Sequence, residues 1–91
     1  MTDKRCCIII SGKVQGVYYR AYTKIHAEKM NVNGYAKNLP DGRVEIVAEG
    51  DEFDVLSFIQ FIRSGPPSAI IESFDVEWQK AKGEFKDFRI D

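Results

Sequence analysis

The hydrophobic residues of this chain follow two different spacings, and the order of these spacings restricts the fold more than any other feature of the sequence. Residues 5–11 form a run rich in β-branched side chains that is apolar on both alternating faces, which predicts a central strand. Residues 17–30 then change to helical spacing, with Tyr19, Thr23 and Ala27 on one face. The chain therefore begins with a strand that is followed by a helix.

A predicted hairpin follows this helix. Residues 32–39 and 43–49 flank the turn Pro40-Asp41-Gly42, and the second segment alternates apolar and polar side chains. Asn31, just before the hairpin, is a typical left-handed residue at the end of a helix. Two such runs around a short turn predict antiparallel strands with one buried face.

A second helix and two further strands complete the predicted elements. Asp51 is a typical N-cap, and the helix should end before Gly65 and the two prolines that follow it. Residues 70–79 and 88–90 alternate apolar and polar side chains, as half-buried strands do. The apolar stripe of the second helix is Val55, Phe58, Ile59 and Ile62.

The resulting order is strand, helix, strand, strand, helix, strand, with a short extra strand at the end. This order predicts an α+β fold, a ferredoxin-like βαββαβ sandwich. An antiparallel sheet of four strands plus a short C-terminal strand should carry both helices on one face. Because 91 residues suffice for one small core, we expect residues 1–91 to form a single domain.

The charge of the chain is balanced, with 13 basic and 14 acidic residues and a formal net charge of −1. Such a balance supplies no overall field that would attract nucleic acid or anionic lipid. No apolar run is long enough to span a bilayer, and the N-terminal residues lack the cleavage site of a secretory signal. We therefore expect a cytoplasmic monomer without nucleic-acid or membrane partners.

The two cysteines, Cys6 and Cys7, are adjacent in the first predicted strand. Neighbouring side chains on a strand point to opposite faces, so a disulfide between them would be strained. The chain has no Cys-x-x-Cys pair and only one histidine, so no metal site is predicted. We expect both cysteines to be core-facing strand residues.

The stretch SGKVQGVYYR, residues 11–20, joins the first strand to the first helix. Glycines at positions 12 and 16 let the backbone N–H groups converge, and the start of the helix adds unpaired donors and a positive dipole end. Arg20 can reach back over the loop with a forked guanidinium. The stretch fits neither the Walker nor the dinucleotide pattern, so a phosphate cradle and a plain turn both remain open on spacing alone.

Two motifs resemble the acylphosphatase family: GKVQGVYYR at residues 12–20, and GYAKNLPDGRV at residues 34–44 followed by Gly50. The resemblance implies that Arg20 binds the phosphate of an acyl phosphate and that Asn38 holds the attacking water. It also implies that the loop amides form the phosphate cradle. These amides belong to Val14, Gln15, Gly16, Val17, Tyr18 and Tyr19.

The sequence departs from the family pattern at two places. Tyr19 stands where phenylalanine is usual, which is a small change if its ring packs in the core and its hydroxyl finds a partner. Leu39-Pro40 occupies a turn where many members carry a hydroxyl residue, so one polar helper near Asn38 is missing.

The resemblance implies an enzyme that hydrolyses the carboxyl-phosphate bond of small acyl phosphates to a carboxylate and inorganic phosphate. A ring of amides and one arginine can stabilise the transferring phosphoryl group without a covalent intermediate. Asn38 has no proton affinity near neutral pH, so it would orient the water for in-line attack. No carboxylate pair adjoins the loop in sequence, which favours a site without metal or cofactor.

Two other functions occur on this order of strands and helices. A non-catalytic phosphate- or anion-binding regulatory domain stays open as the alternative. An RNA-binding RRM domain would need aromatic residues on the strand at residues 43–49, which reads RVEIVAE.

The remaining polar residues are expected to have structural roles. His26 should be structural or at the surface, and the carboxylates at the start of the second helix should cap it. Trp78 should lie in the core or be half-buried. Lys13 and Lys37 either attract the anion from the rim or are simply solvated.

Overall fold

The computed structural model describes residues 3–91, so the first two residues of the predicted 1–91 domain lie outside the described part. The predicted order of strands and helices is confirmed, with boundaries that differ by a few residues. The elements are β1 (Asp3–Lys13), α1 (Tyr19–Lys29), β2 (Asn33–Asn38), β3 (Val44–Asp51), α2 (Glu52–Ser64), β4 (Ile70–Gln79) and β5 (Phe88–Ile90).

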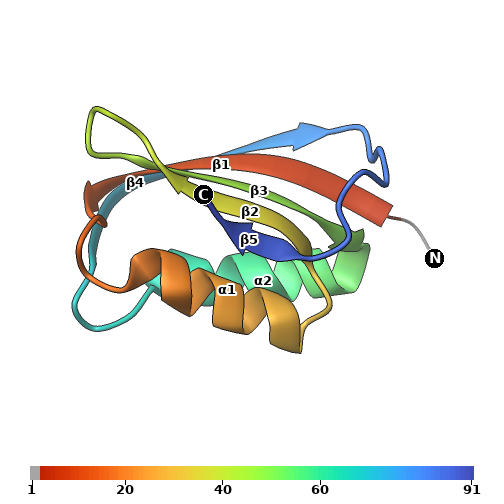
Figure 1. The fold of residues 1–91 in the computed structure, drawn as a ribbon, viewed down its shortest axis with the longest axis horizontal. Coiled ribbons are helices and arrows are strands. Elements are labelled where there is room, and N and C mark those ends of the chain that lie inside the picture. The colour runs from red at the N-terminus through yellow and green to blue at the C-terminus, as the bar shows by residue number, and fades with distance from the viewer. Residues whose placement is uncertain (1–2) are drawn as a thin grey trace.

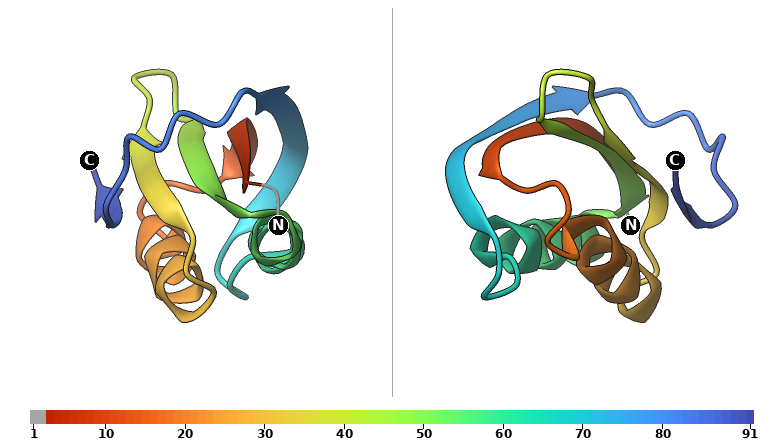
Figure 2. Two further views of the ribbon diagram at one scale, coloured as in Figure 1. Left: turned by 90° about the vertical axis from the view of Figure 1, so that its right-hand side faces the viewer. Right: turned by 60° about the vertical axis from the view of Figure 1, so that its left-hand side comes forward.

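The strands form one sheet in the order β4-β1-β3-β2-β5, and both helices lie side by side on one face of it (Figures 1 and 2). The four long strands pair antiparallel, as expected. The short strand β5 pairs parallel with β2, so the sheet is mixed. The chain leaves β4 at one edge of the sheet and adds β5 beside β2 at the other edge. The alternation of apolar and polar residues does not predict this pairing, because alternation shows which face of a strand is buried and not which strand lies beside it.

The core lies between the sheet and the helices. Every second residue of β1 points into it, and Cys6, Ile8 and Ile10 are completely buried. The predicted stripe of α2 is confirmed, because all four of its residues are buried against the sheet. Burial of a large apolar side chain contributes about 2 kcal/mol, so this contact is the main force that holds the helices in place.

The other face of the sheet is partly covered by residues 80–87, which connect β4 to β5 (Figure 2). The carboxylate of Glu49 on β3 accepts hydrogen bonds from the backbone N–H groups of Lys82 (3.1 Å) and Gly83 (2.5 Å). Arg5 on β1 bonds both Glu49 and Glu84. These contacts attach the connection to the sheet.

Two expectations about single residues need correction or qualification. Cys6 lies in the core, but the prediction for Cys7 is wrong, because Cys7 points to the opposite face and is half-buried there. Both thiols are free. Trp78 is 48% exposed, so the expectation that it lies in the core or is half-buried is wrong, and its ring lies at the surface of the edge strand β4.

Neither helix within residues 3–91 combines the length and the apolar composition that a membrane crossing needs.

The predictions of the residues that cap the helices are confirmed. Asn31 has a left-handed φ of 58°, and the side chain of Asp51 accepts a hydrogen bond from the backbone N–H of Phe53 at 3.2 Å. Gly65 follows α2 with a φ of 69°.

Candidate active site

The loop between β1 and α1 is strongly curled. Gly12 has a φ of 123° at an irregularity in the β1–β4 pairing, and a Cβ there would lie 2.1 Å from the carbonyl oxygen of Ile70. Gly16 and Tyr18 have φ values of 72° and 71°. Left-handed residues at alternate positions turn successive N–H groups toward the inside of the loop. Only glycine fits at position 12, so the sequence dictates this shape locally.

The loop ends at the N-terminus of α1, and Tyr18 occupies the N-cap position. In the described chain no side chain caps this end, and the first turn of α1 contains no acidic residue. The first N–H groups of a helix have no partner inside it, and the helix dipole makes this end positive. The arrangement therefore suits an anion, which would take the place of the missing cap.

A cavity of about 170 Å³ lies at this helix end. Four of the six predicted cradle residues line it together with Arg20, while Gln15 and Val17 belong to the loop without lining the cavity. The spacing of the motif thus brings together groups that can bind one phosphoryl group. The lining residues are Val14, Gly16, Tyr18, Tyr19, Arg20, Ala21 and Ile90.

Ile90 was not a candidate from the sequence, and neither was its neighbour Asp91. The parallel pairing of β5 with β2 places Ile90 opposite Ala36 and so brings the end of β5 to the cavity. The guanidinium of Arg20 donates from Nη1 to the backbone carbonyl of Asp91 at 2.9 Å. No local signal could have found these two residues, because β5 is only three residues long and its register depends on the sheet.

Tyr19 anchors the start of α1 in the core. It is 1% exposed, and its hydroxyl donates a hydrogen bond to the carbonyl oxygen of Ile62 on α2 at 2.6 Å. Burial raises the pKa of this hydroxyl above its ordinary value, so it stays protonated and able to donate. The tyrosine that departs from the family pattern therefore has a buried ring and a bonded hydroxyl.

Asn38 lies at the end of β2 that is closest to the loop. It pairs with Val44, which pairs in turn with Ile10, so these residues form a row across three strands just before the loop begins. The Oδ1 atom of Asn38 is buried and has no hydrogen-bond partner among the described residues. A buried acceptor of this kind is commonly satisfied by an ordered water. Asn38 does not itself line the cavity.

The other polar candidates lie outside this site. Lys13 and Lys37 are exposed. His26 packs between the rings of Tyr22 and Phe61, with centroid distances of 4.5 and 4.6 Å, which is a structural setting. Within residues 3–91, no three His, Cys, Asp or Glu side chains gather as a metal site would require.

The model of the acylphosphatase family matches residues 6–90. Relatives named acylphosphatase include a protein of Dehalococcoides mccartyi strain CBDB1, 47% identical over 90% of this chain and 91% of that protein. Another, from Syntrophus aciditrophicus strain SB, is 48% identical over 96% of this chain and 91% of its own length.

Solved structures agree with the sequence comparisons. The crystal structure of acylphosphatase from Bacillus subtilis has a TM-score of 0.91 and 34% identity, and the match covers 96% of this chain and 97% of that one. The fold is thus the ferredoxin-like α+β sandwich of the acylphosphatases, a class of hydrolases. The chain belongs to the acylphosphatase family.

Proposed function

We propose that this protein is an acylphosphatase that cleaves the carboxyl-phosphate bond of small acyl phosphates by direct attack of water on phosphorus. The observation that carries this proposal is the cavity at the uncapped start of α1, lined by the glycine-containing loop and by Arg20. The membership of the chain in the acylphosphatase family supports catalysis over an anion-binding role alone.

The phosphate would be held by backbone N–H groups of residues 14–19 and by the guanidinium of Arg20. One Arg20 donor is used by the Asp91 carbonyl, and the remaining N–H groups of the fork have no partner in the described part of the chain and can bind phosphate oxygens. Negative charge on the equatorial oxygens of the transition state is stabilised by the same donors. Because the donors are already oriented in the folded protein, little reorganisation accompanies the reaction.

The water would be positioned by Asn38, whose Oδ1 has no partner within residues 3–91 and can accept a hydrogen bond from the water. The water oxygen forms a bond to phosphorus while the bond from phosphorus to the acyl oxygen breaks, and the bonding electron pair leaves with the carboxylate. The proton of the water passes to a phosphate oxygen, since an amide is too weak a base to hold it. The products are a carboxylate and inorganic phosphate, with no covalent phosphoenzyme.

The same proposal includes the setting of the enzyme. Val14 and Tyr19 of the loop belong to the single core, which supports a one-domain arrangement, and the proposal takes the enzyme to be a monomer that needs no metal or cofactor. The balanced charge of the chain favours a small-molecule partner over nucleic acid or a membrane surface, and the proposal takes the enzyme to be cytoplasmic.

The test is hydrolysis of benzoyl phosphate in EDTA, followed by ultraviolet absorbance. Arg20→Ala should lower kcat/KM by about 100-fold or more, as the loss of one transition-state donor does. Asn38→Ala should lower kcat more than it weakens inhibition by inorganic phosphate. Arg63→Ala, which removes an exposed arginine from α2, is the matched control and should be unaffected.

A folded wild type without turnover would overturn the catalytic proposal. If inorganic phosphate still bound, the site would be that of an anion-binding regulatory domain. Circular dichroism of each variant shows whether a loss of activity reflects the site or the fold.

A further inference from the structure

The side chain of Gln15 connects the phosphate loop to the turn between β2 and β3. Its Nε2 atom donates one hydrogen bond to the carbonyl oxygen of Leu39 at 2.8 Å and another to the carbonyl oxygen of Arg43 at 2.9 Å. Both partners are acceptors, so the amide nitrogen, not the oxygen, must face them. The two N–H groups of the side chain are thereby both used, which fixes its orientation.

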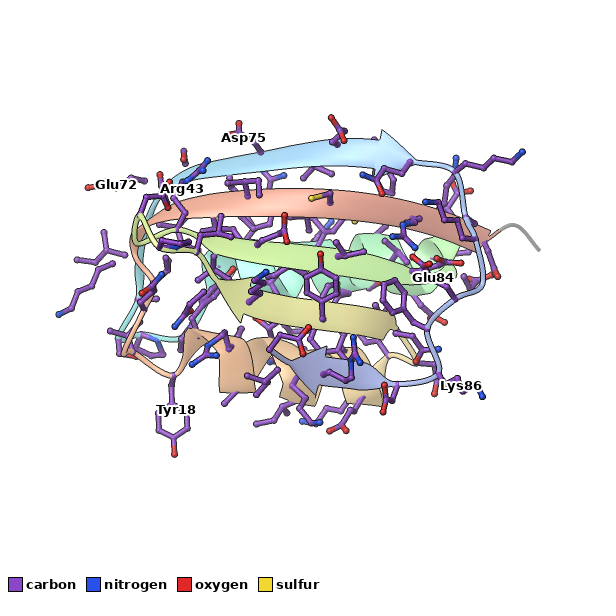
Figure 3. All side chains as sticks on the ribbon, turned by 45° about the horizontal axis from the view of Figure 1, so that its top comes forward. Tyr18, Arg43, Glu72, Asp75, Glu84 and Lys86 are labelled. Atoms are coloured by element: carbon purple, nitrogen blue, oxygen red, sulfur yellow. The ribbon has the colours of Figure 1, made fainter. Side chains whose placement is uncertain are left out.

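The turn that Gln15 contacts is itself held in place by several hydrogen bonds. The backbone N–H of Leu39 donates to the carbonyl oxygen of Arg43 at 2.8 Å, which closes the hairpin. The carboxylate of Asp41 accepts from the backbone N–H of Arg43 at 3.1 Å and from its Nε at 2.7 Å. Figure 3 shows Arg43 in this turn and Tyr18 in the loop at the same end of the molecule. The turn can therefore act as a firm support for the loop.

Asn38 immediately precedes Leu39, the first residue that Gln15 holds. The sheet register fixes the backbone of Asn38, but the loop beyond β1 is exposed at Gly16 and has no strand partner. Gln15 thus lies in the segment that supplies the phosphate-binding amides, and its side chain reaches the segment that supplies Asn38. Among the hydrogen bonds of residues 3–91, those of Gln15 directly join these two segments.

We propose that Gln15 is a positioning residue that holds Asn38, and so the attacking water, in line with the phosphate in the loop. This role rests on the proposed hydrolysis. Attack on phosphorus needs the water opposite the leaving oxygen, and a misplacement of about 1 Å lowers the rate by about 100-fold. Gln15 controls this alignment without contacting the substrate through its side chain.

The experiment is a double-mutant cycle between Gln15→Met and Asn38→Ala, with kcat and the inhibition constant of inorganic phosphate as readouts. Methionine keeps the length of the side chain and removes both donors. Gln15→Met should lower kcat by about tenfold or more, which is less than the roughly 100-fold loss expected when a reacting group is displaced by about 1 Å. The inhibition constant of inorganic phosphate should stay within about twofold of the wild-type value. In the Asn38→Ala background the same change should have almost no further effect, because coupled residues are not additive.

Gln15→Lys provides the conservative comparison. A lysine ammonium can donate to both carbonyl oxygens, so this variant should recover part of the kcat that Gln15→Met loses. Recovery by a donor of different shape would assign the effect to the hydrogen bonds and not to packing.

The outcomes separate this role from the function itself. If Gln15→Met weakens phosphate inhibition as much as it lowers kcat, or if its effect is undiminished beside Asn38→Ala, Gln15 only shapes the cradle and the positioning role is wrong. Unchanged kcat in Gln15→Met beside an active wild type also overturns the role. Absence of turnover in a folded wild type overturns the proposed hydrolysis instead, and the positioning role with it.

Discussion

Arg20 and Asp91 are joined by a 2.9 Å hydrogen bond from the guanidinium to a backbone carbonyl, although 71 positions separate them in the sequence. Asp91 is held in turn by β2, because its backbone N–H donates to the carbonyl oxygen of Ala36 at 2.9 Å. The arginine of α1 is therefore oriented by the strand that carries Asn38. Strand β2 therefore positions both proposed functional side chains, Asn38 directly and Arg20 through Asp91.

This relationship predicts a backbone effect at position 91. Asp91→Pro removes the N–H that anchors the carbonyl, so Arg20 should lose its fixed orientation and inorganic phosphate should bind about fivefold more weakly, as expected for one lost hydrogen bond. Asp91→Ala keeps both backbone groups and should bind phosphate as the wild type does. Inhibition constants for phosphate compare the two, and equal values would show that Arg20 needs no such support.

Tyr19→Phe should destabilise the protein despite the identical ring. Pro66 has no N–H, so the carbonyl oxygen of Ile62 cannot form the usual hydrogen bond with the residue four positions on, and the hydroxyl of Tyr19 takes that place. Its removal leaves a buried acceptor unpaired, at a cost of about 1–2 kcal/mol. Urea unfolding measures this change, and an unaltered midpoint would mean that water reaches the carbonyl.

The buried ion pair between Arg5 and Glu49 should stabilise the folded protein, because it helps to hold the connection between β4 and β5 over the face of the sheet opposite the helices. The two side chains are 9% and 6% exposed, and Nη1 lies 3.3 Å from Oε1. Arg5→Met would leave the Glu49 carboxylate without its cation, and breaking such a pair costs about 3 kcal/mol. The exposed pair of Arg89 and Asp91 is the control, because Arg89→Met should cost less than about 1 kcal/mol. Similar losses in both variants would contradict this reasoning.

Stability should fall in mild acid because of His26. Burial, and then the charge of Lys29, lowers the pKa of His26 below its ordinary value of 6.5. The unfolded chain therefore takes up this proton at a higher pH than the folded one, so the stabilisation from neutral His26 is complete above pH 6.5 and is lost as the pH falls.

Urea titrations between about pH 5 and 7.5 measure this dependence of the free energy of unfolding. In His26→Phe, whose ring can still stack between Tyr22 and Phe61, the curve should be flatter over this range. An equally steep curve would assign the acid sensitivity to other groups.

The two thiols should resist alkylation in the folded protein. Burial, with a smaller contribution from Cys7, raises the pKa of Cys6 to about 12, so almost no thiolate forms at pH 8. The pKa of Cys7 is also raised, first by burial and then by Glu45 and Glu77. Single serine variants treated with a thiol reagent should show Cys7 reacting slowly and Cys6 only after addition of denaturant. Rapid labelling of Cys6 would reveal local opening of β1.

Much of this protein follows from interactions between residues close in sequence. The apolar face of β3, the stripe of α2, the cap at Asp51 and the glycine-containing turn after β1 all appear where local spacing predicts them. The predicted alternation of β3 is only partly met, because Val47 and Glu49 on its other face are buried as well. The loop with Arg20 was a candidate site for the same reason, because a strand, a curled turn and a helix start are local features.

The tertiary structure alone decided which distant groups complete the site. The parallel pairing of β5 with β2 brings Ile90 and the Asp91 carbonyl to Arg20. The side chain of Gln15 reaches a turn whose position depends on the register of β2 and β3. Spacing along the chain encodes which face of an element is buried, but strand pairing is chosen by the packing of the whole sheet, and it is this choice that sets Arg20 and Asn38 on a common support.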